Sequence, residues 1–196
     1  YQMNKKVAVF CGAHSGSEKI FSEHAHEVGK LLADAKAELV FGGGNRGLMG
    51  IVSDAALDNG GKVTGIALEK LDTFEKTNPR ITTEIITKTF FERKEKFLEI
   101  SDAFIVLAGG MGSLDELLDV QVNNQVGMIA KPIVILNTLN YYDSFLAWMD
   151  NAVKYKFLSD ENRKQIIITQ SPAEAVKQAL NIQAPSKEDW MSRLRI

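Results

Sequence analysis

Seven short apolar runs alternate with segments of helical periodicity along this chain of 196 residues. The runs are rich in Val and Ile, as strands that are buried on both faces usually are. Strands that alternate with helices predict βαβ units and a parallel sheet. We therefore expect a single α/β domain whose mainly parallel central sheet is flanked by helices on both faces. The strand-like runs are residues 5–11, 38–41, 62–67, 83–88, 103–107, 132–136 and 165–169.

The size and composition of the chain fit one globular domain. It is 45% hydrophobic and 24% charged, and 196 residues are enough to bury a full core. The net charge is −2 without a basic stripe, so a nucleic-acid partner is not expected. We expect one domain over residues 3–182 and a C-terminal tail over 183–196. Residues 1–2, ahead of Met3, are interpreted as a cloning remnant.

Cysteine content and hydropathy indicate the cellular compartment. Cys11 is the one cysteine, so no internal disulfide forms, and a reducing compartment is favoured. We interpret Cys11 as a small apolar residue at a strand end. The sequence has no apolar run of about 18 residues and no signal-peptide pattern. We therefore expect a cytoplasmic location and no membrane partner.

Three glycine-rich turns follow strand-like runs, at residues 10–16, 41–50 and 108–116. Open parallel sheets bind ligands beyond the carboxyl ends of their strands. A glycine turn that leads into a helix N-terminus favours a bound phosphate. We predict one crevice with a phosphate-bearing ligand, the alternative being that the glycines only satisfy tight corners. No turn has a P-loop ending, and the first turn does not read Gly-x-Gly-x-x-Gly, which argues against a dinucleotide redox cofactor.

The third turn reads Ala108-Gly-Gly-Met-Gly-Ser-Leu-Asp-Glu116. Its last four residues match a capping box, in which Ser113 caps the helix and Glu116 reaches back to the Ser113 amide. A carboxylate and a phosphate would then compete for the positive end of one helix. This conflict is removed if the phosphate lies on the amides of residues 110–113 while Glu116 points toward the sugar.

The segment 90–100 predicts an amphipathic helix with two cations on its apolar face. A helical period places Arg93 and Lys94 among the apolar residues of this face. A cation directed at the protein body needs a carboxylate, an anionic ligand or a route to water. We predict contact with an anion or a carboxylate, with snorkelling to water as the alternative. The apolar residues of this face are Phe90, Phe91, Phe97, Leu98 and Ile100.

Other catalytic chemistries lack support in the sequence. The histidines at 14, 24 and 26 do not have metal-ligand spacing, so we expect no metal. Ser15 and Ser113 have no His and Asp partners by motif, which argues against a serine hydrolase. Nothing beside Lys94 supports a pyridoxal site, and we expect no cofactor.

In combination, these motifs resemble the Lonely Guy family of cytokinin riboside 5′-monophosphate phosphoribohydrolases, whose members were often labelled lysine decarboxylases. The family signature Pro-Gly-Gly-x-Gly-Thr-x-x-Glu is similar to residues 108–116, and the family's Arg-Lys pair matches Arg93-Lys94. The resemblance runs from about Val7 to Leu158. Further matches are Phe10-Cys-Gly12, Gly42 to Gly50, Ser101-Asp-Ala-Phe104, Lys131-Pro132, Leu136-Asn137 and Tyr141-Tyr142.

The resemblance implies a modified Rossmann fold and hydrolysis of the N-glycosidic bond of a nucleoside 5′-monophosphate. The products would be a free base and ribose 5-phosphate, from an AMP-like substrate that includes cytokinin nucleotides. It also implies a homodimer or a larger homo-oligomer. By the same resemblance Arg93 and Glu116 are catalytic, and the glycine turn binds the 5′-phosphate. The implied substrate- and phosphate-binding residues are Gly12, Ser15, Gly43, Gly44, Lys94, Gly109, Gly110, Met111, Gly112 and Ser113.

The chemistry of glycosidic cleavage limits the catalytic roles that Arg93 and Glu116 can have. Glycosidic cleavage passes through an oxocarbenium-like state, in which a nearby carboxylate stabilises positive charge or activates water. Arg93 stays protonated and cannot shuttle protons, so it clamps phosphate or acts electrostatically. Glu116 is left as the base or charge stabiliser.

The chain departs from the family pattern at several positions. Ala108 replaces proline and Ser113 replaces threonine, which keeps the glycines and the hydroxyl of the turn. Phe90-Phe91 stand where the family has Met-His, and Val122-Asn123 where it has Thr-Trp. We expect these four residues to border the substrate. The alternative functions are a nucleotide-binding or carrier module without catalysis and, third, a pyridoxal-dependent amino-acid decarboxylase.

Overall fold

The computed structural model describes residues 5–69 and 76–181. All its strands form one seven-stranded sheet in the order β4-β3-β2-β1-β5-β6-β7, and every described pair is parallel. The seven predicted runs all form strands, each end within one residue of its predicted position. The strands are β1 (Lys6–Phe10), β2 (Glu38–Phe41), β3 (Val63–Leu68), β4 (Thr83–Thr87), β5 (Ala103–Val106), β6 (Ile133–Leu136) and β7 (Ile166–Thr169).

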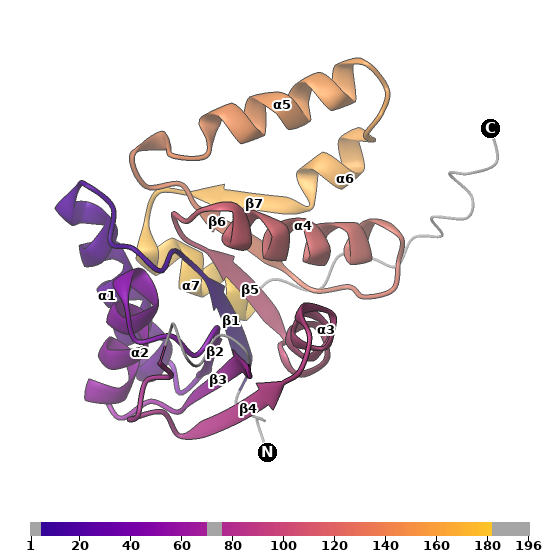
Figure 1. The fold of residues 1–196 in the computed structure, drawn as a ribbon. Helices are drawn as coiled ribbons and strands as arrows, with labels where there is room; N and C mark the ends of the chain where they lie inside the picture. The colour runs from indigo at the N-terminus through magenta and orange to yellow at the C-terminus, as the bar shows by residue number, and fades with distance from the viewer. Residues whose placement is uncertain (1–4, 70–75, 182–196) are drawn as a thin grey trace.

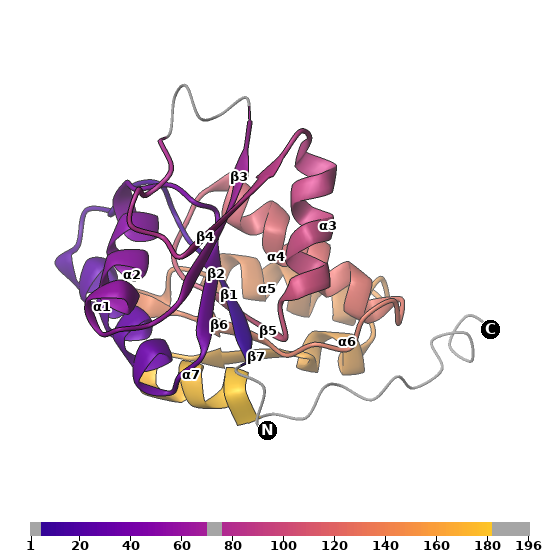
Figure 2. The ribbon, with the colours of Figure 1, turned by 90° about the horizontal axis from the view of Figure 1, so that it is seen from below.

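Helices cover both faces of the sheet, as Figures 1 and 2 show. Helices α1, α2 and α7 lie on one face, and α3, α4 and α5 lie on the other, with α6 beside α5 and β7. The predicted α/β class is therefore confirmed. The helices are α1 (Lys19–Asp34), α2 (Gly47–Asp58), α3 (Phe90–Ile100), α4 (Met111–Gln125), α5 (Asp143–Lys154), α6 (Asp160–Lys164) and α7 (Pro172–Asn181), with a 3₁₀ turn η1 (Thr138–Asn140).

The sheet separates two hydrophobic cores. Along β1, Val7 and Val9 enter the core beneath α1, α2 and α7, while Ala8 and Phe10 enter the core beneath α3, α4 and α5. Successive side chains of a strand point to opposite faces, so both sets must be apolar when both faces are covered. This is why the strands appear in the sequence as continuous apolar runs rather than as alternating patterns.

The strand order places a crevice at the carboxyl ends of β1 and β5. The chain builds the sheet outward from β1 to β4, then returns to the other side of β1 with β5. Open α/β sheets bind ligands where the order reverses in this way. The three glycine turns meet there, because Gly12 N donates to Ala108 O (3.0 Å) and Leu48 N donates to Gly12 O (3.1 Å). The predicted convergence of the turns is confirmed.

The start of α3 differs from the predicted apolar face. Phe97 is buried, but Phe90 and Phe91 are 55% and 82% exposed. Thr89 caps the helix by accepting a hydrogen bond from Glu92 N (3.1 Å), so Phe90 and Phe91 fall in the first turn. Phe90 lies beside the crevice, and Phe91 does not. The expected tail 183–196 and residues 1–2 lie outside the described residues. Within the described ranges, no helix is long and apolar enough to cross a membrane.

Candidate active site

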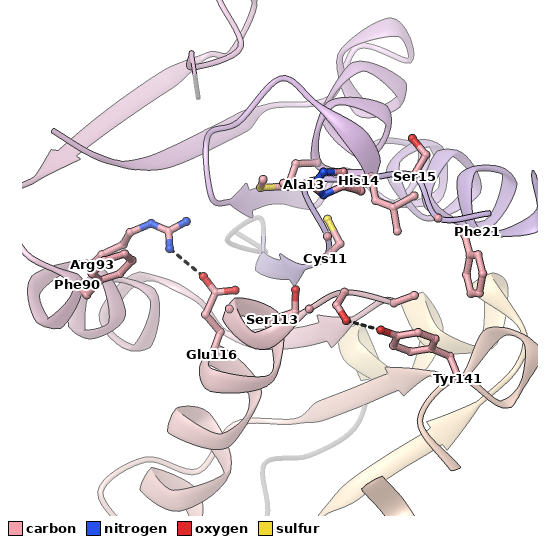
Figure 3. Close-up of a pocket in the computed structure, with 18 residues that line it drawn as sticks. Cys11, Ala13, His14, Ser15, Phe21, Phe90, Arg93, Ser113, Glu116 and Tyr141 are labelled. Carbon is pink, nitrogen blue, oxygen red and sulfur yellow. Dashed lines mark hydrogen bonds and ion pairs between the residues drawn. The ribbon is translucent and has the colours of Figure 1, made fainter. Parts of the chain in front are cut away.

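The crevice holds a cavity of about 500 Å³, within the usual range for small-molecule sites. Its walls come from the turns after β1 and β5, from side chains of α1, α2, α3 and α4, and from the segment after η1. Figure 3 shows Phe90 and Arg93 at one end, Tyr141 and Phe21 at the other, and Ser113 between them. The cavity is therefore elongated, with the glycine turn along its middle.

Arg93 reaches the cavity from the first turn of α3 and is fixed by three hydrogen bonds. Its Nε donates to Ile66 O (2.8 Å), Nη1 donates to Glu116 Oε1 (2.9 Å), and Nη2 donates to Gly42 O (3.3 Å). The guanidinium also lies 5.3 Å from the centre of the Phe97 ring. A guanidinium has five N–H donors, so two remain for a ligand. The predicted contact of this cation with a carboxylate is confirmed.

Gly42 is a site residue that the sequence analysis did not single out. A Cβ atom at this position would lie 2.4 Å from Arg93 Nη2, so a side chain and the guanidinium cannot both occupy this space. The run of three glycines at 42–44 marked this region in the sequence, but Gly43 and Gly44 were predicted as binding residues and Gly42 was not. Gly43 has a φ of +88° and faces Ala67, and Gly44 forms an isolated bridge with Thr77. None of the three glycines lines the cavity, and Gly42 belongs to the site through its contact with Arg93.

Glu116 lies on the second turn of α4, and its side chain is 13% exposed, as is that of Arg93. Burial raises the pKa of the Glu116 carboxyl above its ordinary value of 4.5, because the charged form loses hydration. The Arg93 guanidinium acts in the opposite direction and offsets part of this effect. The result is a carboxyl group that binds a proton more readily than an exposed glutamate does.

The predicted capping box at Ser113 is wrong. Helix α4 begins at Met111 with Gly110 as its N-cap, and no side chain caps it. Ser113 is buried in the first turn, where a Cβ at Gly109 would lie 2.1 Å from Ser113 Oγ. Glu116 binds Arg93 rather than the Ser113 amide. The helix starts early because Gly109 leaves room for the Ser113 side chain to lie inside the turn.

An uncapped helix start leaves backbone amides available to an anion. The first N–H groups of a helix have no partner within the helix, and they point out along its axis. In α4 they include the amides of Gly112 and Ser113, which line the cavity, and the glycines at 110 and 112 leave open space in place of a side chain. The turn is therefore suited to a phosphate group.

The structure gathers six of the ten predicted binding residues around the cavity. Met111 is 84% exposed and does not line it. Lys94 contacts Asp115 (3.3 Å) and Asp119 (3.7 Å) instead, so its predicted carboxylate contact is confirmed, outside the cavity. The six that line the cavity are Gly12, Ser15, Gly109, Gly110, Gly112 and Ser113.

Of the four departures from the family pattern, one borders the cavity. Phe90 lines it, whereas Phe91 and Val122 are exposed elsewhere and Asn123 donates to Asp119 O on its own helix. The expectation that all four border the substrate is wrong within this chain. The reason for Val122 and Asn123 is that they lie in the second half of α4, whereas the cavity is lined by the first two turns of this helix.

Tyr141 is a further cavity residue whose part the sequence did not indicate. Its hydroxyl donates to Gly109 O (2.6 Å), and its ring lies 5.9 Å from that of Phe21. The sequence offered only the Tyr141-Tyr142 match. Strand β6 leads into η1, and the segment after η1 brings Tyr141 to the glycine turn that follows β5.

Cofactor chemistry can be tested against the described residues. Among them, no group of three or more His, Cys, Asp or Glu side chains is placed to hold a metal ion. Pyridoxal phosphate is held by a lysine Schiff base, and none of the described residues that line the cavity is a lysine. The cavity as described therefore does not fit pyridoxal phosphate.

Comparison with known proteins gives consistent sequence relatives. A family model described as "Possible lysine decarboxylase" matches residues 49–179. The chain is 36% identical over 190 residues to the cytokinin riboside 5′-monophosphate phosphoribohydrolase LOG2 of Arabidopsis thaliana, covering 97% of this chain and 89% of that protein. It is 37% identical over 172 residues to the phosphoribohydrolase LOG of Oryza sativa subsp. japonica, covering 88% and 71%.

A solved structure with the same fold is the molybdenum cofactor carrier protein of Chlamydomonas reinhardtii. The TM-score is 0.69 at 19% sequence identity, over 92% of this chain and 100% of that one. At this level of identity the likeness concerns the fold alone.

Proposed function

The chain belongs to the Lonely Guy family of cytokinin riboside 5′-monophosphate phosphoribohydrolases, and we propose that it hydrolyses the N-glycosidic bond of a nucleoside 5′-monophosphate. The products are the free base and ribose 5-phosphate. One observation carries this proposal: the buried Arg93 and Glu116 pair lies one helical turn from the free amides of α4. A carboxylate at that distance from a phosphate site suits chemistry on the attached sugar.

The substrate orientation follows from the order of these groups along the cavity. The 5′-phosphate binds the amides at residues 110–113, and the ribose extends along α4 toward Glu116. The base then lies at the end of the cavity formed by Phe90 and Arg93 (Figure 3). An aromatic ring is a suitable stacking surface for any base. We propose AMP-like nucleotides, including cytokinin nucleotides, as the substrate class.

In this orientation Glu116 acts at the anomeric carbon. The bond between this carbon and the base nitrogen breaks, and its electron pair leaves with the base. Positive charge develops on the ribose ring, and the ionised carboxylate stabilises it. Water then adds to the anomeric carbon, and its proton passes to Glu116 or to the departing base. Glu116 is the one carboxylate among the described residues of the cavity wall.

Arg93 acts electrostatically rather than as a phosphate clamp. Three of its donors are used by Ile66 O, Glu116 and Gly42 O, which fixes the guanidinium at the sugar and base end of the cavity. It favours the ionised form of Glu116 against the cost of burial and leaves two N–H groups for the substrate. Removal of one such preorganised donor typically costs about 10²-fold or more in rate.

Exposed apolar side chains support a homo-oligomer, which we propose to be a dimer. Met111 and Val122 share one face of α4 and are 84% and 52% exposed, and Phe91 on α3 is 82% exposed. Large exposed apolar groups on adjoining helices are typical of protein interfaces. Light scattering at micromolar concentration measures the mass. A monomer would contradict this part of the proposal.

The central experiment is release of free adenine from AMP, measured by chromatography for the wild type and for Glu116→Gln. We expect turnover in the wild type and a loss of at least 100-fold in the variant. A screen of other nucleoside monophosphates follows if AMP is inert. If the wild type releases base from none of these nucleotides faster than Glu116→Gln does, the proposed hydrolase activity is refuted.

The same proteins and nucleotides also test the two alternative functions, a carrier module and a decarboxylase. A binding or carrier module would bind AMP saturably in calorimetry without splitting it. A decarboxylase would carry pyridoxal phosphate absorbance, which the absence of a lysine among the described residues of the cavity wall argues against.

A further inference from the structure

The carbonyl of Gly109 is held by a side chain from a distant part of the chain. Tyr141 Oη donates to Gly109 O at 2.6 Å, and among the described residues it is the one hydrogen-bond donor to this oxygen. Gly109 and Gly110 are adjacent, so the peptide plane between them is flanked by two residues without a Cβ. Such a plane can rotate more easily than one between ordinary residues.

The orientation of this plane decides what the turn presents to an anion. In a trans peptide the N–H and C=O groups point in opposite directions, and no described peptide is cis. With Gly109 O bound to Tyr141, the N–H of Gly110 points away from that ring. A rotated plane would bring a carbonyl oxygen to the side that now carries an N–H donor, and the oxygen would repel a phosphate.

Tyr141 is itself fixed by an unusual backbone segment. Leu139 and Asn140 have φ values of +52° and +60°, a conformation that is unfavourable for residues with a side chain. Asn140 is held by Gln170 Nε2, which donates to its side-chain oxygen at 2.6 Å. Backbone strain of this kind persists only where the surroundings enforce it. Here it directs the Tyr141 hydroxyl at the glycine turn.

Tyr141 and its neighbour Tyr142 differ in solvent exposure, and this difference indicates different roles for their hydroxyl groups. Tyr142 is 5% exposed, and its hydroxyl donates to Leu107 O (2.8 Å), a bond that a buried hydroxyl requires. Tyr141 is 49% exposed, so water could satisfy its hydroxyl equally well. Burial therefore does not account for the bond from Tyr141 to Gly109.

We propose that Tyr141 is a positioning residue for phosphate binding, whose hydroxyl fixes the Gly109–Gly110 peptide in the orientation that accepts an anion. This inference rests on the proposed function for the identity of the ligand. Its test uses ribose 5-phosphate, the proposed product, because this compound is not turned over and reports binding separately from catalysis.

The experiment compares Tyr141→Phe with Tyr142→Phe, since each variant removes one tyrosine hydroxyl from the same segment. Calorimetry gives the Kd of ribose 5-phosphate and of inorganic phosphate, and thermal unfolding gives Tm. Loss of one hydrogen bond predicts a Kd about 3- to 10-fold weaker for Tyr141→Phe, with Tm little changed. Tyr142→Phe should lower Tm and keep Kd within about twofold, because Leu107 O loses a buried partner.

Kinetics add a second readout. The KM for AMP should rise in Tyr141→Phe by about the factor by which the Kd of ribose 5-phosphate weakens, and the KM should change more than kcat does. An unchanged Kd in Tyr141→Phe, or equal weakening in both variants, overturns the inference. Wild-type protein that binds ribose 5-phosphate without splitting any nucleotide refutes the proposed function alone. Wild-type protein that binds neither probe refutes both.

Discussion

Replacement of Gly42 by alanine tests whether catalysis depends on the position of the Arg93 guanidinium. The new Cβ would lie 2.4 Å from Arg93 Nη2, whereas ordinary contacts begin near 3.4 Å, so the nitrogen must retreat by roughly 1 Å. Its bond to Gly42 O is then lost, and Nη1 moves relative to Glu116. Gly42 does not have a positive φ, so the backbone itself tolerates alanine.

A misplacement of 1 Å in a catalytic group can cost about 10²-fold in rate. We expect kcat for adenine release from AMP to fall by about this factor in Gly42→Ala. The KM should change little, because the amides at the start of α4 are untouched. The affinity for ribose 5-phosphate should likewise stay within about twofold of the wild type.

Gly60→Ala is the matched control. Gly60 has a φ of +74°, and a Cβ there meets nothing within 4 Å, so alanine strains the backbone without touching the site. We expect Gly60→Ala to lower stability by about 1 kcal/mol and to keep kcat. A folded Gly42→Ala protein with kcat within twofold of the wild type would refute the reasoning.

Three further perturbations test single side chains. Burial raises the pKa of Glu116 above 4.5, and this carboxyl group acts in its ionised form. The value of kcat/KM should therefore fall as the pH drops through this raised pKa. A pH profile of kcat/KM that stays flat down to pH 4.5 would contradict this. Phe90→Ala should raise KM for AMP by about tenfold through lost stacking, yet leave the calorimetric Kd of ribose 5-phosphate unchanged. Lys94→Ala should change kcat/KM by less than about threefold, because Lys94 pairs with Asp115 and Asp119 outside the cavity, and a larger loss would place it in substrate binding.

The fold could be predicted from the sequence because the five inner strands, β1, β2, β3, β5 and β6, are buried on both faces. Residues such as Val7 to Phe10 must all be apolar, which produces a run that no surface element would show. The ends of helices were less predictable. Ser113 and Glu116 fit a capping box by spacing, but the choice between this and an earlier start at Gly110 depends on contacts with Gly109 and Arg93.

The charged pair of the site could be predicted from the sequence, but the contacts that hold this pair and the glycine turn in place could not. Arg93 and Glu116 were identified by helical period and by family resemblance, and they meet at 2.9 Å. Gly42 and Tyr141 act through space on groups that are 51 and 32 residues away in sequence. No local pattern encodes such distances. Spacing also could not tell which glycine of the run 42–44 faces the guanidinium.

The uncapped start of α4 links ligand binding to folding. A side-chain cap stabilises a helix by about 0.5–2 kcal/mol, and α4 lacks one at Gly110. A bound phosphate group would accept the hydrogen bonds that a serine or aspartate side chain accepts in other helices. The substrate then completes the secondary structure of the protein that binds it, and mass action favours the folded state in proportion to the ligand present. The stability of this protein would therefore follow the supply of nucleotide in its surroundings.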